Sequence, residues 1–178
     1  MSGVYDVILC DPPWSYESGT LLTKWSIEEH YKTMPLDDIK AMGPFVDSLA
    51  AKDCVLFMWT TAPKLGEAFE VLTAWGWNYR TGAVWYKNGL GMGHYFRCNH
   101  EHLLVAIKGH PKTPPDEMLE GSVFELKKGR HSEKPDYFRG LIERYYPAAR
   151  KIELFAREKV PNWDVWGLEA PSQNTTLF

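Results

Sequence analysis

The sequence predicts an α/β fold, in which helices cover both faces of a mainly parallel β-sheet. Two observations lead to this prediction. Short apolar segments rich in β-branched residues, typical of buried strands, recur along the chain, and segments with a helical spacing of apolar residues lie between them. The 178 residues fit one domain over residues 1–178, and they contain no internal repeat.

The first part of the chain begins with an apolar, β-branched stretch over residues 4–10, which predicts a buried strand. A polar, glycine-containing stretch over residues 15–23 then predicts a loop. The spacing of apolar residues predicts two short helices, over residues 26–31 and 36–42. The second has two aspartates in its first turn, where they favour the helix dipole. Residues 53–59 predict a second buried strand.

A longer helix is predicted over residues 63–75, with a proline in its first turn and a glycine directly after its end. Its apolar side chains Leu65, Phe69 and Leu72 share one face, which we expect to be buried. Residues 77–86 predict a third strand, and a glycine-rich loop follows it.

The last part of the chain predicts three further strands, over residues 103–107, 122–126 and 151–155. Residues 135–146 predict a helix with an inward apolar face. That face consists of Phe138, Leu141, Ile142 and Tyr145. A tryptophan-rich tail follows the last strand.

Composition limits the classes of function. The formal net charge is −3, so any contact with nucleic acid must use a local basic patch. Three widely spaced cysteines give no disulfide framework, which favours a reducing cytosol. No signal peptide and no apolar run of ~20 residues are visible, so we expect a cytoplasmic protein without a membrane partner. The aromatic content of 14%, with eight tryptophans, suits a protein that stacks on bases.

The stretch Asp11-Pro12-Pro13-Trp14 ends the first predicted strand. Ligands of open α/β sheets bind beyond the carboxyl ends of strands, where Asp11 lies. Its carboxylate and the proline carbonyls can accept hydrogen bonds from an amine, and Trp14 could cover a flat ring. The two prolines hold this frame stiff. The alternative interpretation is a turn that ends the strand, with Trp14 in the core.

The tetrapeptide DPPW resembles the motif of the MT-A family of adenine N6-methyltransferases. Later blocks of that family have similar counterparts here in the same order, namely HEHLLVAIKGHP, GRHSEKPDYFRGLIERYYPAARKIELFAR and PNWDVWG. The resemblance covers Val4 to about Glu169. It implies a Rossmann-like class I methyltransferase fold that uses S-adenosylmethionine, with the catalytic motif before the cofactor motif.

The resemblance also implies a set of site residues. The catalytic residues would be Asp11, Pro12, Pro13 and Trp14. The cofactor contacts would be Cys10, Asp11, Pro13, Lys108, Arg157 and Glu169. The substrate contacts would be Trp14, Tyr16, His94, Arg97, Glu101, Arg130, His131 and Lys134.

In this scheme Asp11 and the Pro12 carbonyl take the adenine amine and Trp14 supports the base. Lys108 faces the cofactor carboxylate, and Arg157 and Glu169 lie near its ribose and adenine. The basic cluster over residues 127–134 would contact phosphates, although a solvated loop is the alternative. The tail over residues 161–178 would pack on the cofactor side, with its last residues flexible.

Two features depart from known patterns. The F-x-G-x-G loop of many methyltransferases is absent, because the last strand ends KIELFAREK. The related eukaryotic enzyme has Gly-Asn-Gln where this chain has Gly167-Leu168-Glu169.

Cys98, His100 and His102 occupy alternate positions, as metal ligands on one face of a strand can. No second ligand pair at zinc-like spacing accompanies them, so we expect no metal.

A compact domain without a target-recognition domain favours DNA over RNA as the substrate, and the target base must leave the stack to be methylated. The alternatives are an RNA adenosine N6-methyltransferase, a small-molecule methyltransferase, or a catalytically silent subunit that binds nucleic acid or a partner. Silent members of the family typically lose the aspartate or the aromatic residue of DPPW, and both are present here. A homodimer or heterodimer is possible, and we expect a bacterial or phage-infected cell.

Overall fold

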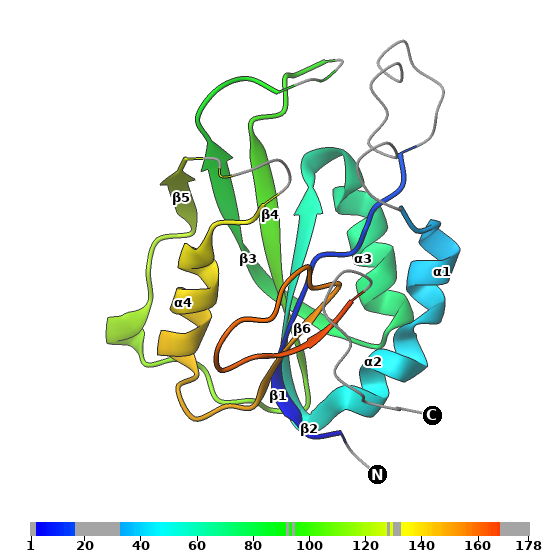
Figure 1. Ribbon diagram of the computed structural model, residues 1–178, viewed down its shortest axis with the longest axis vertical. Coiled ribbons are helices and arrows are strands. Elements are labelled where there is room, and N and C mark those ends of the chain that lie inside the picture. Colours follow the sequence, from blue (N-terminus) through cyan, green and yellow to red (C-terminus); the bar gives the residue numbers. More distant parts are fainter. Residues whose placement is uncertain are drawn as a thin grey trace.

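A β-sheet in the order β5-β3-β4-β2-β1-β6-β7 forms the centre of the molecule (Figure 1). The computed structural model describes residues 3–16, 33–91, 93, 95–127, 129 and 133–167. The strands of this part of the chain are β1 (Tyr5–Cys10), β2 (Ala50–Thr61), β3 (Asn78–Lys87), β4 (His100–Lys108), β5 (Val123–Leu126), β6 (Lys151–Leu154) and β7 (Asp164–Trp166). Its helices are α1 (Leu36–Ala41), α2 (Gly43–Leu49), α3 (Leu65–Ala74) and α4 (Asp136–Tyr145), with short 3₁₀ turns η3 (Ala62–Lys64) and η4 (Asp116–Met118).

The sheet is mainly parallel, as predicted, with β4 as the reversed strand. The pairs β1–β2, β1–β6, β6–β7 and β3–β5 are parallel. β4 is antiparallel to both of its neighbours, β2 and β3. The carboxyl ends of the other six strands therefore lie at one edge of the sheet, and β4 begins at that edge.

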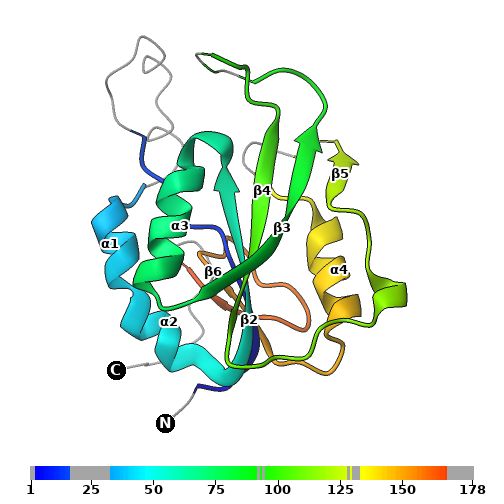
Figure 2. The same ribbon diagram turned by 180° about the vertical axis from the view of Figure 1, so that it is seen from behind.

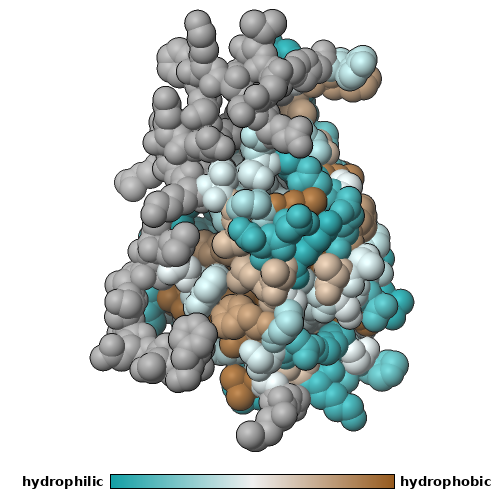
Figure 3. Space-filling view, turned by 90° about the vertical axis from the view of Figure 1, so that its right-hand side faces the viewer, coloured by the Kyte–Doolittle hydropathy of each residue, from teal (hydrophilic) through white to brown (hydrophobic). Residues whose placement is uncertain are grey.

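Helices cover both faces of the sheet, with α1, α2 and α3 on one side and α4 on the other (Figures 1 and 2). β1 shows the alternation that this arrangement needs. Ile8 and Cys10 pack in the cluster under α1–α3, whereas Val7 and Leu9 pack in the cluster under α4. The outer surface on the α1 side mixes hydrophilic and hydrophobic residues (Figure 3).

Several predicted elements have different bounds in the structure. The helix predicted from residue 63 begins with the η3 turn, and its buried face contains Ala68, Val71 and Leu72. Phe69 is 38% exposed and packs edge-on against Tyr79 of β3. Of the predicted face, Leu72 is buried and Leu65 packs against the core, whereas Phe69 is replaced by Ala68 and Val71.

Neither α2 nor β7 was predicted from the sequence. α2 begins with a Gly-Pro pair that suggests a break, but the proline lies in the first turn of the helix, where the missing N–H costs nothing. β7 has three residues and is held by pairing with β6, which a local pattern does not reveal. The predicted helix over residues 26–31 lies outside the described residues.

Candidate active site at the carboxyl edge of the sheet

The Asp-Pro-Pro-Trp stretch turns away from the end of β1 in a hydrogen-bonded frame. The backbone N–H of Trp14 donates to the Pro12 carbonyl at 2.8 Å, and the N–H of Met34 donates to the Pro13 carbonyl at 2.8 Å. A carbonyl oxygen has two lone pairs, so each of these oxygens retains one acceptor site. The prolines fix φ, and the two bonds fix the direction of the chain, so Asp11 is held at the edge of the sheet.

Trp14 lies in the core rather than over an open site. Its side chain is 5% exposed and packs in the cluster beneath α1 and α3. Its indole N–H donates to the carbonyl of Trp59 in β2 at 3.1 Å. This corrects the expected position of Trp14 over a substrate ring and agrees with the alternative interpretation, in which the ring anchors the turn.

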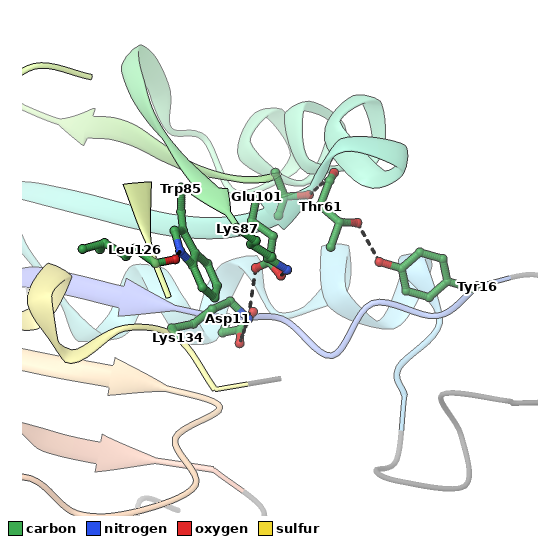
Figure 4. Close-up of polar contacts among 9 residues, drawn as sticks. Asp11, Tyr16, Thr61, Trp85, Lys87, Glu101, Leu126 and Lys134 are labelled. Carbon is green, nitrogen blue, oxygen red and sulfur yellow. Dashed lines mark hydrogen bonds and ion pairs between the residues drawn. The ribbon is translucent and has the colours of Figure 1, made fainter. Parts of the chain in front are cut away.

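Four charged side chains of alternating sign meet at this edge (Figure 4). Nζ of Lys134 lies 2.6 Å from Oδ2 of Asp11 and 3.4 Å from Oε2 of Glu101. Glu101 also forms an ion pair with Lys87 through its other oxygen. These residues come from the end of β1, the start of β4, the end of β3 and the segment before α4, so four distant parts of the chain build one charge network.

Two tryptophan rings lie beside the cations of this network. The ammonium of Lys134 lies 5.8 Å from the ring centroid of Trp59, and that of Lys87 lies 4.8 Å from Trp85. The electron-rich ring faces attract these charges. The indole N–H of Trp85 donates to the carbonyl of Leu126 at 2.9 Å, which fixes the ring against β5 (Figure 4).

Burial and the neighbouring charges shift the pKa values of the network in different directions. Burial raises the pKa of Asp11, and Glu101 adds to this rise, against the ammonium of Lys134. Burial also opposes ionisation of Glu101, but Lys134 and Lys87 outweigh it and lower its pKa. Burial works against the charge of Lys134, yet the two carboxylates raise its pKa. Glu101 and Lys134 are thus charged at neutral pH, and Asp11 is a more basic carboxylate than an exposed one.

The model of the MT-A70 family matches residues 5–169 of the chain. The chain belongs to the MT-A70 family. The type II methyltransferase M.MunI of Mycoplasma sp is 35% identical over 190 residues, which cover 97% of this chain and 81% of that protein. An N(6)-adenosine-methyltransferase MT-A70-like protein of Drosophila melanogaster is 32% identical over 93% of this chain and 27% of that protein.

The human N(6)-adenosine-methyltransferase catalytic subunit METTL3 is 30% identical over 93% of this chain and 28% of that protein. This chain therefore spans most of the Mycoplasma relative but 27% and 28% of the two animal relatives. The family and the α/β methyltransferase-type fold predicted from DPPW and the later blocks are confirmed.

Lys108 does not lie at the edge where this MT-A70 family chain holds Asp11. It ends β4, where it pairs in register with Cys54 near the start of β2, and it forms an ion pair with Asp47. Asp11 instead follows Cys10, which pairs with Met58. The expected position of Lys108 was wrong because β4 runs antiparallel, so its last residue reaches the opposite edge of the sheet.

Other predicted residues lie around the network or apart from it. Arg157 is close enough for its charge to lower the pKa of Asp11. The hydroxyl of Tyr16 bonds that of Thr61 at 2.6 Å, beside the Asp11 group rather than within it (Figure 4). The side chain of Cys10 is fully buried, and burial raises the pKa of its thiol, so its sulfur belongs to the core. Four predicted residues lie outside the described part of the chain: His94, Arg130, His131 and Glu169.

Lys87, Trp59 and Trp85 join the site without having been predicted as site residues. The register of β3 and β4 pairs Trp85 with Glu101. Lys87, at the end of β3, therefore lies close to Glu101, but this closeness cannot be predicted without the register. Among the described residues, no group of three His, Cys, Asp or Glu side chains could hold a metal ion. Within the same part of the chain, none of the helices is long and apolar enough to cross a membrane.

Proposed function

We propose that this MT-A70 family adenine N6-methyltransferase acts on DNA and takes its methyl group from S-adenosylmethionine. The observation that carries the proposal is the carboxylate of Asp11, held at the carboxyl edge of the sheet with the ammonium of Lys134 at 2.6 Å. We infer DNA because the relative of similar extent is a bacterial type II methyltransferase, of which the chain covers 81%.

The two charged groups at this edge fit the amino-acid end of S-adenosylmethionine, which carries one ammonium and one carboxylate. Asp11 offers a carboxylate and Lys134 an ammonium, and their mutual ion pair places these two complementary groups side by side. In this proposal Lys134 takes the place expected of Lys108, while Arg157, Glu169 and the backbone of Cys10 and Pro13 keep their proposed contacts. When bound, the cofactor supplies an electrophilic methyl group on its sulfonium.

Asp11 would hold the amine of the target adenine. Its Oδ2 accepts the bond from Lys134, and Oδ1 has two lone pairs, so it can accept one N–H of the adenine amine and one N–H of the cofactor ammonium. The second N–H goes to the free lone pair of the Pro12 carbonyl. The amine nitrogen is a weak nucleophile because its lone pair is delocalised into the ring. The two hydrogen bonds favour a pyramidal, electron-rich nitrogen, and the stiff proline frame keeps it in place.

The chain does not need a strong base. The amine proton becomes acidic only after nitrogen has gained the methyl group, and it then passes to Asp11 or to water. The raised pKa of Asp11 suits it to accept that proton. Glu101 and Lys87 position Lys134 from the other side, so most of the rate enhancement would come from orientation and electrostatics.

A tritiated methyl-transfer assay tests this proposal. It compares duplex DNA, single-stranded DNA and RNA, and nucleoside analysis then identifies the product. We expect N6-methyldeoxyadenosine, and label in RNA alone would overturn the choice of DNA. If no polymer is labelled and calorimetry finds no binding of S-adenosylmethionine, the silent-subunit alternative holds instead.

The role of Asp11 has a matched test. D11N keeps the size of the side chain but removes its charge, and we expect at least about a hundredfold loss of transfer rate. D47N removes a carboxylate at the opposite edge of the sheet, where Asp47 pairs with Lys108, and should leave the rate within about twofold of the wild type. Retained activity in D11N would overturn the mechanism. Location in the cytoplasm and the oligomeric state stay predictions.

A further inference from the structure

The connection between β3 and β4 extends past the edge of the sheet where Asp11 lies (Figures 1 and 2). Hydrogen bonds hold its stem. The N–H of Lys87 donates to the Asn99 carbonyl at 2.7 Å, and that of Gly91 donates to the Cys98 carbonyl at 3.0 Å. Nε of Arg97 also donates to the Gly91 carbonyl, at 2.8 Å. The loop is therefore a continuation of the β3–β4 hairpin.

Two adjacent aromatic rings project from this hairpin into solvent. Tyr95 is 97% exposed and Phe96 is 88% exposed, the highest values among the large hydrophobic side chains of the described residues. Most tryptophans of the same residues are buried, so exposed rings are not the rule for this chain. Two neighbouring apolar rings in water indicate a binding surface, because their burial against a partner is favourable.

The chemistry of the segment favours a flat, anionic partner. Residues 88–100 contain one arginine and two histidines but no aspartate or glutamate. The segment also begins directly after Lys87 and ends directly before Glu101, which are both part of the charge network that reaches Asp11. A partner that contacts the rings thus lies beyond the same edge of the sheet as the proposed methylation site (Figures 1 and 2). Nucleic acid has both a flat surface, in its bases, and negative charge, in its phosphates.

We propose that Tyr95 and Phe96 form an aromatic wedge that enters the base stack of DNA beside the target adenine. An adenine within a duplex cannot reach Asp11 until it has left the stack. Rings inserted between base steps unstack them, and stacking of the remaining bases on the rings offsets the cost. The wedge rests on the proposed function and adds the element that would hold the duplex open.

The double variant Y95A/F96A tests the wedge on native and heat-denatured samples of one DNA preparation that lacks N6-methyladenine. Denatured DNA needs little unstacking. We expect kcat/KM to fall at least about tenfold on duplex DNA and less than about threefold on denatured DNA. The ring-preserving double variant Y95F/F96Y should retain activity on both forms. Y79A is the matched control, since Tyr79 is a half-exposed tyrosine at the opposite end of β3.

Each other outcome has a defined meaning. Unchanged activity of Y95A/F96A on duplex DNA, or an equal loss on both forms of DNA, overturns the wedge while leaving the proposed function standing. A wild-type oligomer that Y95A/F96A breaks, measured by light scattering, also overturns it, because the rings then join copies of this chain. Absence of transfer by the wild type to either form of DNA overturns the proposed function, and the wedge with it.

Discussion

Replacing Lys134 by methionine would remove the cation that lies between two carboxylates. Nζ of Lys134 lies 2.6 Å from Asp11 and 3.4 Å from Glu101. Methionine has a similar length, so its side chain can keep the contact with the Trp59 ring. The change therefore removes charge with little loss of packing. Asp11 then loses its ion-pair partner, and Glu101 keeps only Lys87.

The expected cost follows from burial. Removal of one partner from a buried ion pair costs about 3–5 kcal/mol. The side chains of Lys134 and Glu101 are 16% and 9% exposed, but that of Asp11 is 29% exposed, so water screens part of the repulsion. We therefore expect the free energy of unfolding of K134M to fall by about 2–3 kcal/mol at neutral pH.

The cost should shrink as the pH falls. Without Lys134, the pKa of Asp11 rises further in the folded protein, so the folded state binds more protons than the unfolded state in acid. The protonation of Asp11 therefore stabilises folded K134M as the pH falls from the pKa of Asp11 in the folded state toward 3.8, its value in the unfolded state. The destabilisation of K134M relative to the wild type should thus be largest at about pH 7.5 and smaller at about pH 5.

Urea unfolding at both pH values measures this difference. K40M is the matched control, because Lys40 pairs with Glu70 on the surface, where their side chains are 28% and 57% exposed. Exposed pairs contribute little to stability, so K40M should change the unfolding midpoint much less. If K134M is no more destabilising than K40M, or if its cost grows in acid, the charge network does not act as described.

Three further predictions concern residues around the site. W14F removes the indole N–H that donates to the buried Trp59 carbonyl, so thermal unfolding should show a loss of about 1–3 kcal/mol. Burial and His100 lower the pKa of His102, so the free energy of unfolding of the wild type should fall as the pH falls below the usual value of 6.5. H102Q lacks this titration, so acid-unfolding curves should show a smaller fall for it. K108M should transfer methyl groups within about twofold of the wild-type rate, because Lys108 lies at the opposite edge of the sheet; a larger loss with intact folding would contradict this placement.

The place of Asp11 could be predicted because it depends on local features. An apolar strand followed by two prolines marks the end of that strand, and ligands of α/β sheets bind at such ends. Glu101 and Lys134 were found through the family blocks, but their contact with Asp11 depends on tertiary packing. Trp14 shows the same limit, since the sequence left open whether its ring packs in the core or faces a ligand.

Lys108 shows what an apolar pattern leaves undetermined. The segment that contains it was correctly predicted as a strand, but such a pattern does not give the direction of the strand. A clue was present in the loop between the third and fourth strands, which contains no helical pattern. A parallel connection needs a crossover, usually a helix, whereas a hairpin joins antiparallel strands directly. With that clue, the start of β4, and hence Glu101, would have been placed at the edge of the sheet that holds Asp11.

The reversal of β4 separates the proposed catalytic residue Asp11 from the proposed DNA-binding hairpin. The other strands bring their last residues to the edge that holds Asp11, but β4 brings its first, so the hairpin before β4 extends from that edge. Its tip can change in length and sequence without altering the register of any strand. In the proposed scheme, exchange of this hairpin between relatives would therefore alter which nucleic acid is held, while the methyl-transfer chemistry proposed for Asp11 stays the same.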